Sequence, residues 1–492
     1  MPGSRFLVAL VASGMALMAG PSWAVSTLPC PSVGAQAPST AILAAGQDNA
    51  CENWVTTRTV NQPGANLSSA NLSHVFLAGN LDGADLHLAN LQFLETPICP
   101  GLTARNANLA SADLRSARLV CSDFAGANFS NANLTNARSD YVIGTSFAGA
   151  HFDGANLTGF SAQSATFDDA IFTGATLTNT TFIESRFART DFSGRSFAGA
   201  RFFGGDLSDA NFSEADLTSV PITNYNSNRP TRLDRTDFSF ATLTALQIVF
   251  ARDAVGTLFT QADLSLASLL TSFSQADFSG ANLFRAQLGG ACLGCSFRNA
   301  VLIETDLSQA TLFGSDLTGA TLSAGTILAG ARYDPQTIFP SGATFVGPTW
   351  GLPGGLSPFA SGMVADFTND DVSGLNLAGF PFPNVAMGNL IARGTNFSNA
   401  NLSGAGLAGA DLSGANLTGA NLTGATLVNA RYDQATLFPS GGPWSQKPWG
   451  LPGGSSPWNL GMKPVPEPTG VAGLAAGLVA LAGFAIARRR AE

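Results

Sequence analysis

Residues 145–182 read TSFAGAHFDGANLTGFSAQSATFDDAIFTGATLTNTTF, and the large apolar residues of this stretch recur at every fifth position. This period matches neither the 3.6 residues of an α-helix nor the two residues of a plain β-strand. It continues along the chain, with centres at Phe147, Phe152, Leu157, Ala162, Phe167, Phe172, Leu177, Phe182, Phe187, Phe192, Phe197, Phe202, Leu207, Phe212 and Leu217. A regular repeat therefore decides the fold.

Each repeat unit has its own polarity pattern. A small residue mostly stands two positions before the centre, as in Ala155-Asn156-Leu157 and Ala200-Arg201-Phe202. Two-residue alternation places the small residue and the centre on one side of the chain and the middle residue on the other. The Ser, Thr, Gly and Asn residues after each centre favour a turn. Such a chain can coil around an axis, bury both inward positions and stack its coils as strands stack in a sheet.

The pattern Ala-(Asp/Asn)-Leu-x-x resembles the pentapeptide repeat family. It is carried by Ala65-Asn66-Leu67, Ala84-Asp85-Leu86, Ala112-Asp113-Leu114, Ala281-Asn282-Leu283 and Ala415-Asn416-Leu417. The resemblance covers most of residues 64–334 and 373–433. It implies an all-β fold, a right-handed quadrilateral β-helix with four faces of five residues in each coil. Residues twenty apart then stack, which predicts a column of Phe152, Phe172, Phe192 and Phe212.

Composition limits the classes of function. The 492 residues include 24 Lys plus Arg and 33 Asp plus Glu, a net charge of −9, and 45% are hydrophobic. So apolar a chain can bury a large core and is not a disordered acidic tail. The only lysines are Lys447 and Lys463, and the arginines are dispersed. Without clustered positive charge, we expect no nucleic-acid partner.

The first 24 residues have the order of a processing segment. Arg5 precedes an apolar run from Phe6 to Ala19, and small residues surround Trp23 up to Ala24. This order is typical of a secretory signal peptide cleaved after Ala24. A buried N-terminal helix is the alternative. Export would place the mature chain in an oxidising compartment.

The other end carries three features in a fixed order. Val465, Pro466, Glu467 and Pro468 precede an uncharged stretch, and Arg488, Arg489 and Arg490 follow it. A helix from Val471 to Ala487 would be roughly 25 Å long, near the lower limit for a transmembrane helix. The arginines would stay in the cytoplasm. This predicts one C-terminal transmembrane helix.

The order of these features resembles the PEP-CTERM sorting signal of Gram-negative bacteria. The resemblance implies recognition by an exosortase-type membrane peptidase and a transient intermediate anchored in the inner membrane. Removal of the tail would then deliver the protein to the cell surface or the extracellular matrix. A permanent C-terminal anchor is the alternative.

The sequence also contains a second, longer repeat, in which several motifs recur after a constant offset of 99 residues. Residues 331–334, ARYD, and 350–355, WGLPGG, recur as 430–433 and 449–454. Loss of the five-residue period and the arrival of Pro, Gly and Trp predict a plug after each array. We favour a hydrophobic cap over a carbohydrate-stacking site for Trp350, Trp444, Trp449 and Trp458.

The sequence therefore divides into seven segments. We expect a signal peptide (1–24), an N-terminal cap (25–63), a long first β-helix (64–334), a cap or linker (335–372), a short second β-helix (373–433), a second cap or linker (434–464) and the sorting tail (465–492). The register breaks around residues 91–109 and 218–237. The insert at 218–237 either forms a contact surface or only absorbs extra length.

Six cysteines suggest disulfides in an exported chain. Cys30 with Cys51 would close the N-terminal cap, and Cys99 with Cys121 would pin the first irregular loop to the next coil. Cys292 and Cys295 have the spacing of a redox motif but lack the helix N-terminus that lowers a thiol pKa. The period places a centre at Leu293, with Cys295 inward and Cys292 outward.

Residues that could carry chemistry are scarce. His74, His87 and His151 lie apart and form no metal-ligand spacing, and His74 falls in a solvated turn position. Asp85, Asp113, Asp191, Asp216 and Asp411 occupy the outward middle position, where they serve the regularity of the surface. We expect no cofactor, no metal and no enzymatic activity.

The prediction is an exported, non-catalytic scaffold that acts as a structural or interaction protein. The first alternative is a surface protein that binds extracellular polysaccharide or ice. The second follows from family members that imitate B-DNA and protect DNA gyrase. A net charge of −9 spread over this length is weak mimicry, and export would remove the protein from a cytoplasmic target.

Overall fold

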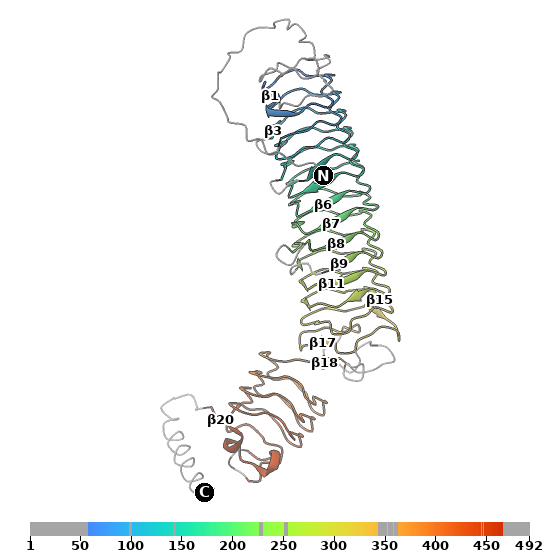
Figure 1. The fold of residues 1–492 in the computed structure, drawn as a ribbon. Helices are drawn as coiled ribbons and strands as arrows, with labels where there is room; N and C mark the ends of the chain where they lie inside the picture. The colour runs from blue at the N-terminus through green and yellow to red at the C-terminus, as the bar shows by residue number, and fades with distance from the viewer. Residues whose placement is uncertain are drawn as a thin grey trace, which may run out of the picture.

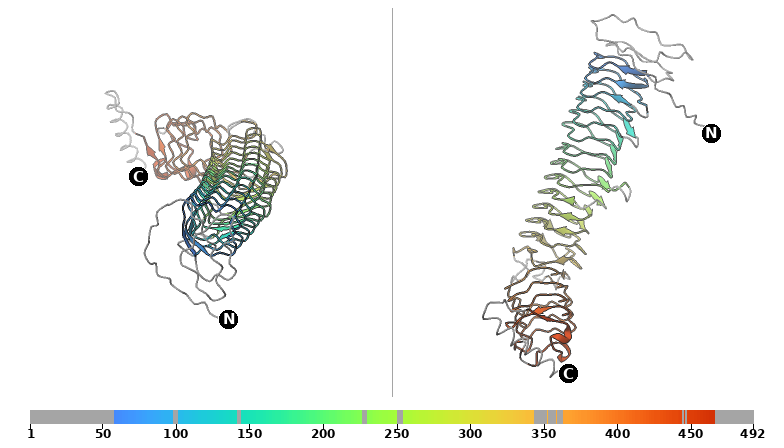
Figure 2. Two further views of the ribbon diagram at one scale, coloured as in Figure 1. Left: turned by 90° about the horizontal axis from the view of Figure 1, so that it is seen from above. Right: turned by 90° about the vertical axis from the view of Figure 1, so that its left-hand side faces the viewer.

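The chain winds into a long right-handed β-solenoid (Figure 1). The computed structural model describes residues 58–97, 101–140, 144–225, 230–249, 254–342, 352, 358, 363–443, 445 and 447–465. Viewed from the end and from the side, the coils form one rod of nearly constant width, followed by a shorter second array (Figure 2). The predicted all-β, right-handed β-helix is confirmed.

The strands are short because each coil turns again after only a few residues. The first ten are β1 (Arg58–Asn61), β2 (Leu77–Asn80), β3 (Leu102–Thr103), β4 (Arg138–Asp140), β5 (Ser161–Gln163), β6 (Thr181–Ile183), β7 (Arg201–Phe203), β8 (Pro221–Thr223), β9 (Gln247–Val249) and β10 (Ala254–Val255). The others are β11 (Ser268–Leu270), β12 (Phe273–Ser274), β13 (Gln287–Leu288), β14 (Cys292–Leu293), β15 (Val301–Leu302), β16 (Thr321–Leu322), β17 (Arg332–Tyr333), β18 (Val364–Ala365), β19 (Arg431–Tyr432) and β20 (Lys463–Pro464). Two 3₁₀-helices, η2 (Pro452–Gly454) and η3 (Trp458–Leu460), lie near the C-terminal end of the described chain.

Successive coils pair in parallel, so the outward residues at equivalent positions of each coil form a column along the rod. One column of bridges joins Asn66, Asp85, Asn108, Asn128, His151, Ile171, Asp191, Asn211, Asp237, Leu258, Asp277, Ser296, Asp316 and Ile338. At about 4.8 Å per step this column spans roughly 60 Å. On another face eight strands form one sheet, in the order β13-β11-β9-β8-β7-β6-β5-β4.

The predicted phenylalanine column forms the centre of the rod. Ring centroids lie 4.8 Å apart between Phe152 and Phe172, 4.7 Å apart between Phe172 and Phe192, and 4.9 Å apart between Phe192 and Phe212. All four rings are stacked and fully buried. Burial of each ring contributes about 1.5–3 kcal/mol, before any aromatic contribution.

The small inward position often holds Thr or Ser instead of Ala, because a hydroxyl there reaches the preceding coil. Oγ1 of Thr190 donates to the carbonyl oxygen of Phe167 at 2.7 Å, and Oγ1 of Thr236 donates to that of Leu207 at 2.9 Å. Both threonines are fully buried. The hydrogen bond satisfies the buried hydroxyl, which would otherwise oppose folding.

At the corners the backbone turns through the left-handed region, which favours Gly and Asn. Gly199 has a φ of 71° and lies over Asn179 of the preceding coil. A Cβ at residue 199 would collide with Oδ1 of Asn179. The absence of a side chain at Gly199 therefore lets the corner residues of adjacent coils stack closely.

Coil length varies around the predicted twenty. His151 pairs with Ile171 twenty residues later, Asp85 with Asn108 twenty-three later, and Asp206 with Arg232 twenty-six later. The polar insert is thus shorter than the predicted 218–237, because β8 (Pro221–Thr223) continues the sheet between β7 and β9. The six extra residues are accommodated after β8.

The segment predicted as the first cap or linker, 335–372, does not end the stacking of coils. Arg332 of β17 pairs with Val364 of β18, and the backbone nitrogen of Val364 donates to the carbonyl oxygen of Ala331 at 2.7 Å. The second array therefore starts directly on the last coil of the first (Figure 1). The residues that continue the five-residue period there are all buried, namely Leu377, Phe382, Met387, Ala392, Phe397 and Leu402.

Among the residues that the structure describes, no helix has the length and apolarity needed to cross a membrane. The predicted span from Val471 to Ala487 lies outside those residues.

Candidate functional site

The regular outward carboxylates hold turns together. Oδ1 of Asp191 accepts a hydrogen bond from the backbone nitrogen of Ser193 at 3.0 Å, and Oδ1 of Asp216 accepts one from that of Thr218 at 3.0 Å. The backbone nitrogens at positions 87, 115 and 413 likewise donate to Asp85, Asp113 and Asp411. An Asx turn of this kind explains why Asp and Asn alternate freely at the middle position.

Hydrogen bonds also join these side chains from coil to coil. Nδ2 of Asn211 donates to Oδ1 of Asp191 at 3.0 Å, and Nε2 of Gln92 donates to Oδ2 of Asp113 at 2.8 Å. Partial burial acts to raise the pKa of Asp113, but hydrogen bonds from Arg115 and Gln92 outweigh it and hold the pKa below its usual range. A carboxyl group held ionised in this way is unsuited to donate a proton at neutral pH.

The histidines occupy separate places, as the sequence indicates. His74 has a φ of 59° and its exposed ring stacks on Phe93, with ring centroids 4.7 Å apart, so it packs against a neighbour as well as contacting solvent. Nδ1 of His87 lies 3.0 Å from Oδ1 of Asp85, and Nδ1 of His151 lies 3.5 Å from Oδ2 of Asp153. Within the described ranges, no three His, Cys, Asp or Glu side chains are grouped so as to hold a metal ion.

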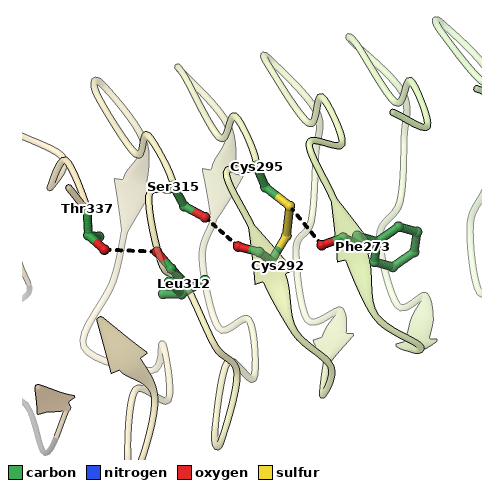
Figure 3. The surroundings of a disulfide bond; sticks show 6 residues. All are labelled: Phe273, Cys292, Cys295, Leu312, Ser315 and Thr337. Atoms are coloured by element: carbon green, nitrogen blue, oxygen red, sulfur yellow. Dashed lines mark hydrogen bonds between the residues drawn. A yellow bond between two sulfur atoms is a disulfide. The ribbon is translucent and has the colours of Figure 1, made fainter. Parts of the chain in front are cut away.

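Cys292 and Cys295 form a disulfide inside the rod (Figure 3). Cys292 is fully buried and Leu293 is 41% exposed, so the prediction that Leu293 is the centre and Cys292 points outward is wrong. A centre at Leu293 would make the unit between Leu293 and Phe297 one residue short. The short unit instead lies between the buried Leu288 and Cys292, because the coil aligns Cys292 with Phe273. Cys295 does occupy the small inward position, as predicted.

The sulfur of Cys295 takes the place that hydroxyls hold in the next coils. The sulfur of Cys295 lies 3.6 Å from the carbonyl oxygen of Phe273 (Figure 3). In the next two coils, Oγ of Ser315 donates to the carbonyl oxygen of Cys292 at 2.6 Å, and Oγ1 of Thr337 donates to the carbonyl oxygen of Leu312 at 2.9 Å. Neither sulfur-bearing side chain is more than 1% exposed. A bond so buried is inaccessible to an exchanging thiol, which favours a structural role.

The other predicted cysteine pairs lie wholly or partly outside the described residues. Cys121 is disulfide-bonded, and its partner is not among the described residues. The pairings of Cys30 with Cys51 and of Cys99 with Cys121 therefore stay predictions.

The described part of the second plug covers the end of the second array with apolar side chains. Trp449, Leu451 and Met462 are 6%, 4% and 4% exposed, and the rings of Trp449 and Trp458 meet edge to face with centroids 5.3 Å apart. Nζ of Lys447 lies 5.0 Å from the ring centroid of Trp449. A buried indole cannot stack on a sugar, so Trp449 fits the cap interpretation. Trp350 and Trp444 lie outside the described residues.

The junction of the two arrays gathers carboxylates that sequence reasoning missed. Arg332 forms an ion pair with Asp366. One terminal amide atom of Gln336 lies 2.9 Å from Oδ2 of Asp334 and 3.3 Å from Oδ1 of Asp370, and it is assigned as the nitrogen because both neighbours are carboxylate oxygens. Partial burial, together with the charges of Asp334 and Asp366, raises the pKa of Asp370 to about 6. These residues are far apart in the sequence, and only the pairing of β17 with β18 brings them together.

The predicted sorting residues cannot be placed, except for Val465. Its backbone nitrogen donates to the carbonyl oxygen of Tyr432 at 2.7 Å, next to the pairing of β19 with β20. Pro466, Glu467, Pro468, Arg488, Arg489 and Arg490 lie outside the described residues, as does the signal peptide.

A family model for pentapeptide repeats matches the chain in eight copies, within residues 105–138, 142–174, 163–194, 196–220, 271–293, 294–324 and 392–431. These stretches fall in both arrays and follow the five-residue period of the solenoid. No curated protein matches the chain.

Several solved structures are similar to the chain. HetL, a pentapeptide repeat protein involved in heterocyst differentiation regulation in Nostoc sp. strain PCC 7120, is 25% identical, with 52% of this chain and 91% of HetL covered and a TM-score of 0.24. A pentapeptide repeat protein of the Arabidopsis thaliana thylakoid lumen is 19% identical, with 22% and 66% covered and a TM-score of 0.15. QnrB1, a plasmid-mediated fluoroquinolone resistance protein, is 16% identical, with 42% and 91% covered and a TM-score of 0.15.

Proposed function

Because this chain is a solenoid of pentapeptide repeats, we propose that it is an exported, non-catalytic scaffold of the cell surface or extracellular matrix. In this proposal an exosortase-type membrane peptidase sorts it from an inner-membrane intermediate. The observation that carries the scaffold role is the use of the outward carboxylates. Asp85, Asp113, Asp191, Asp216 and Asp411 all accept hydrogen bonds from the turn that follows them. Each of these five carboxylates is engaged in its own turn, where it maintains the rod.

The cysteines support export independently of the two termini. The three cysteines in the described part of the chain, Cys121, Cys292 and Cys295, are all disulfide-bonded. Disulfides persist in oxidising compartments and are rare in the cytosol. The proposal thus agrees with the signal peptide predicted at residues 1–24.

Imitation of DNA is less well supported than a scaffold. Such a surface needs many uncompensated negative charges. Here Arg186 pairs with Asp168, Arg189 with Asp169, and Arg235 with Asp209, so much of the acidic charge is neutralised locally. A supercoiling assay of DNA gyrase in the presence of the purified chain tests this alternative directly.

The sorting proposal is tested in a Gram-negative host that contains an exosortase. A tag placed between residues 25 and 57, after the predicted signal peptide, labels the mature chain. We expect the mature chain to lose its basic end and to appear outside the inner membrane. Substitution of Pro466, Glu467 and Pro468 by Ala should trap the full-length protein in that membrane, because the apolar span and the three arginines remain. Deletion of residues 465–492 is the control and should release a soluble exported protein.

Surface delivery of the substituted protein at the level of the parent would contradict the sorting proposal. The C-terminus would then be an ordinary anchor or a peripheral helix. Retention of the deletion variant in the cytoplasm would contradict the predicted signal peptide instead.

A further inference from the structure

One face of the rod carries three arginines in one outward column. It is formed by the sheet from β4 to β13, whose strands β6, β7, β8, β9 and β11 lie one above another along the rod (Figure 1). In the sequence, the eight strands of this sheet contain two arginines and one acidic residue, Asp140. The chain as a whole has an excess of acidic residues. The strands of this sheet therefore contain one more basic than acidic residue.

The arginines of this face share one outward column. The exposed Glu95 pairs in register with Arg118, and Arg118 pairs with Arg138, followed by Ser161, Thr181 and Arg201 in the next coils. Arg118 and Arg138 thus lie one step apart, about 4.8 Å along the rod, and Arg201 lies three steps, roughly 14 Å, beyond Arg138. Like charges placed directly opposite each other on adjacent strands are destabilising. Arg118 and Arg138 nevertheless lie next to each other, whereas Ser161 and Thr181 occupy the same column in the coils between Arg138 and Arg201.

Most other arginines in the described part of the chain have an acidic partner. Ion pairs involve Arg105, Arg115, Arg186, Arg189, Arg232, Arg235, Arg285, Arg298, Arg332 and Arg393. Among the described residues, by contrast, no acidic side chain is within ion-pair distance of Arg118, Arg138 or Arg201. Arg138 and Arg201 are exposed, and Arg118 is half-buried. Their guanidinium groups are available to an external anion.

A second row of side chains runs beside the arginine column. The third residues of successive strands are in register and are Gln163, Ile183, Phe203, Thr223, Val249 and Leu270. The five from Ile183 onwards are half-buried. The arginine column itself continues beyond Arg201 with Pro221, Gln247, Ser268, Gln287 and Asp306. The face thus combines cations, neutral hydrogen-bonding groups and a partly apolar edge at the regular spacing of the coils.

We propose that this face binds one extended strand of an acidic polysaccharide along the rod axis. Guanidinium groups recognise carboxylates through paired hydrogen bonds. The neutral Ser, Thr and Gln side chains suit sugar hydroxyls, and the row with Phe203 and Val249 suits the apolar faces of sugar rings. A linear polymer that carries charges at intervals suits a column with one close pair of arginines and a third arginine roughly 14 Å beyond it. Binding would also neutralise the close pair of Arg118 and Arg138.

Binding of an acidic polysaccharide would deepen the proposed scaffold function. It rests on that function in one respect, because the protein must be exported in order to meet an extracellular polymer. Its test uses the purified full chain in a mild nonionic detergent, with polygalacturonate as the acidic polymer and dextran as the neutral one. We expect saturable binding of polygalacturonate that weakens with added NaCl, because salt screens exposed charges. We expect no measurable binding of dextran.

Two triple variants of equal charge separate this face from general attraction. In the first, Arg118→Gln, Arg138→Gln and Arg201→Gln remove the unpaired arginines, and affinity for polygalacturonate should fall at least tenfold. In the matched control, Arg189→Gln, Arg235→Gln and Arg285→Gln remove arginines that pair with acidic residues elsewhere, and affinity should change less than twofold. Equal thermal midpoints of the two variants would show that both remain folded.

A further variant tests the apolar row. Phe203→Ser should weaken binding several-fold and leave the dependence on NaCl unchanged, because it removes contact area without charge. Equal losses in the two triple variants, or no binding of polygalacturonate by the parent, would overturn the proposal. Tighter binding of double-stranded DNA than of polygalacturonate, through the same three arginines, would identify a nucleic acid as the partner and would also overturn it. None of these outcomes depends on how the protein is sorted.

Discussion

Replacement of Phe192 by Asp is the sharpest test of the inward and outward positions. The Phe192 ring is fully buried, and its centroid lies 4.7 Å from that of Phe172 and 4.9 Å from that of Phe212. It also meets Phe197 edge to face at 5.3 Å. Loss of such a ring costs about 3–5 kcal/mol in stability. The variant therefore removes the middle member of a continuous stack.

The introduced carboxyl adds a second cost. The rings of Phe172, Phe197 and Phe212 surround it and offer no hydrogen bond, so its folded-state pKa would rise by about 3 units or more. At about 1.4 kcal/mol per unit this adds roughly 4 kcal/mol at pH 7, for a total of about 7–9 kcal/mol. A raised folded-state pKa means that the folded state binds the proton more tightly. The second cost is present in full above the raised pKa and is recovered as the pH falls towards 4.

Thermal unfolding and amide hydrogen exchange measure the effect. Because each coil contacts only its neighbours, faster exchange should be confined to the coils around residues 167–217. The matched control is Asn156→Asp, since Oδ1 of Asn156 accepts hydrogen bonds from the backbone nitrogen and the hydroxyl of Thr158, which a carboxylate can also accept. The control should melt within a degree or two of the parent. Equal melting temperatures for the two variants would refute the inward and outward assignment.

Three further predictions concern the corners, the junction and the disulfides. Gly199→Ala should destabilise the protein by about 1–2 kcal/mol more than Gly194→Ala. Both residues have a positive φ, but only a Cβ at residue 199 would meet a neighbouring coil. Similar losses of stability for the two variants in chemical denaturation would contradict this reasoning. Asp370 has its pKa raised to about 6, so the junction should be more stable at pH 5 than at pH 7.5, and Asp370→Asn should abolish that difference in thermal midpoint. A difference that survives the substitution would assign the effect to another group. Peptide mapping of the oxidised, exported protein should find Cys99 linked to Cys121, and free thiols at both would contradict the predicted pairing.

The period of five was sufficient to predict the solenoid and most of its core. Alternation of side chains within a short extended segment is a local property, so the inward position of Phe172 or Leu177 follows from its immediate neighbours. The outward position of Asp191 and Asp216 follows in the same way. Stacking at an interval of twenty also holds wherever no residue is inserted or lost, as in the four-membered phenylalanine column.

Insertions and deletions set the limit of that reasoning. A missing residue could be assigned on either side of Cys292, and only the pairing of Cys292 with Phe273 and the disulfide to Cys295 show where it falls. The loss of the period after residue 334 predicted a cap or linker, and the sequence did not show that the stacking of coils resumes after it. The pairing of Arg332 with Val364 shows that the stacking resumes, since it continues the hydrogen bonding of the coils.

The column of Arg118, Arg138 and Arg201 also depends on how many residues each coil gains or loses. Arg118 and Arg138 are twenty residues apart, an interval that the period itself makes neighbours. Arg201 is sixty-three residues beyond Arg138 and joins their column only because one of the three intervening coils is three residues longer than twenty. Local alternation determined which side chains point outward, because it needs only adjacent residues. The tertiary structure alone decided which of them share a column, because that depends on the summed length of every coil between them.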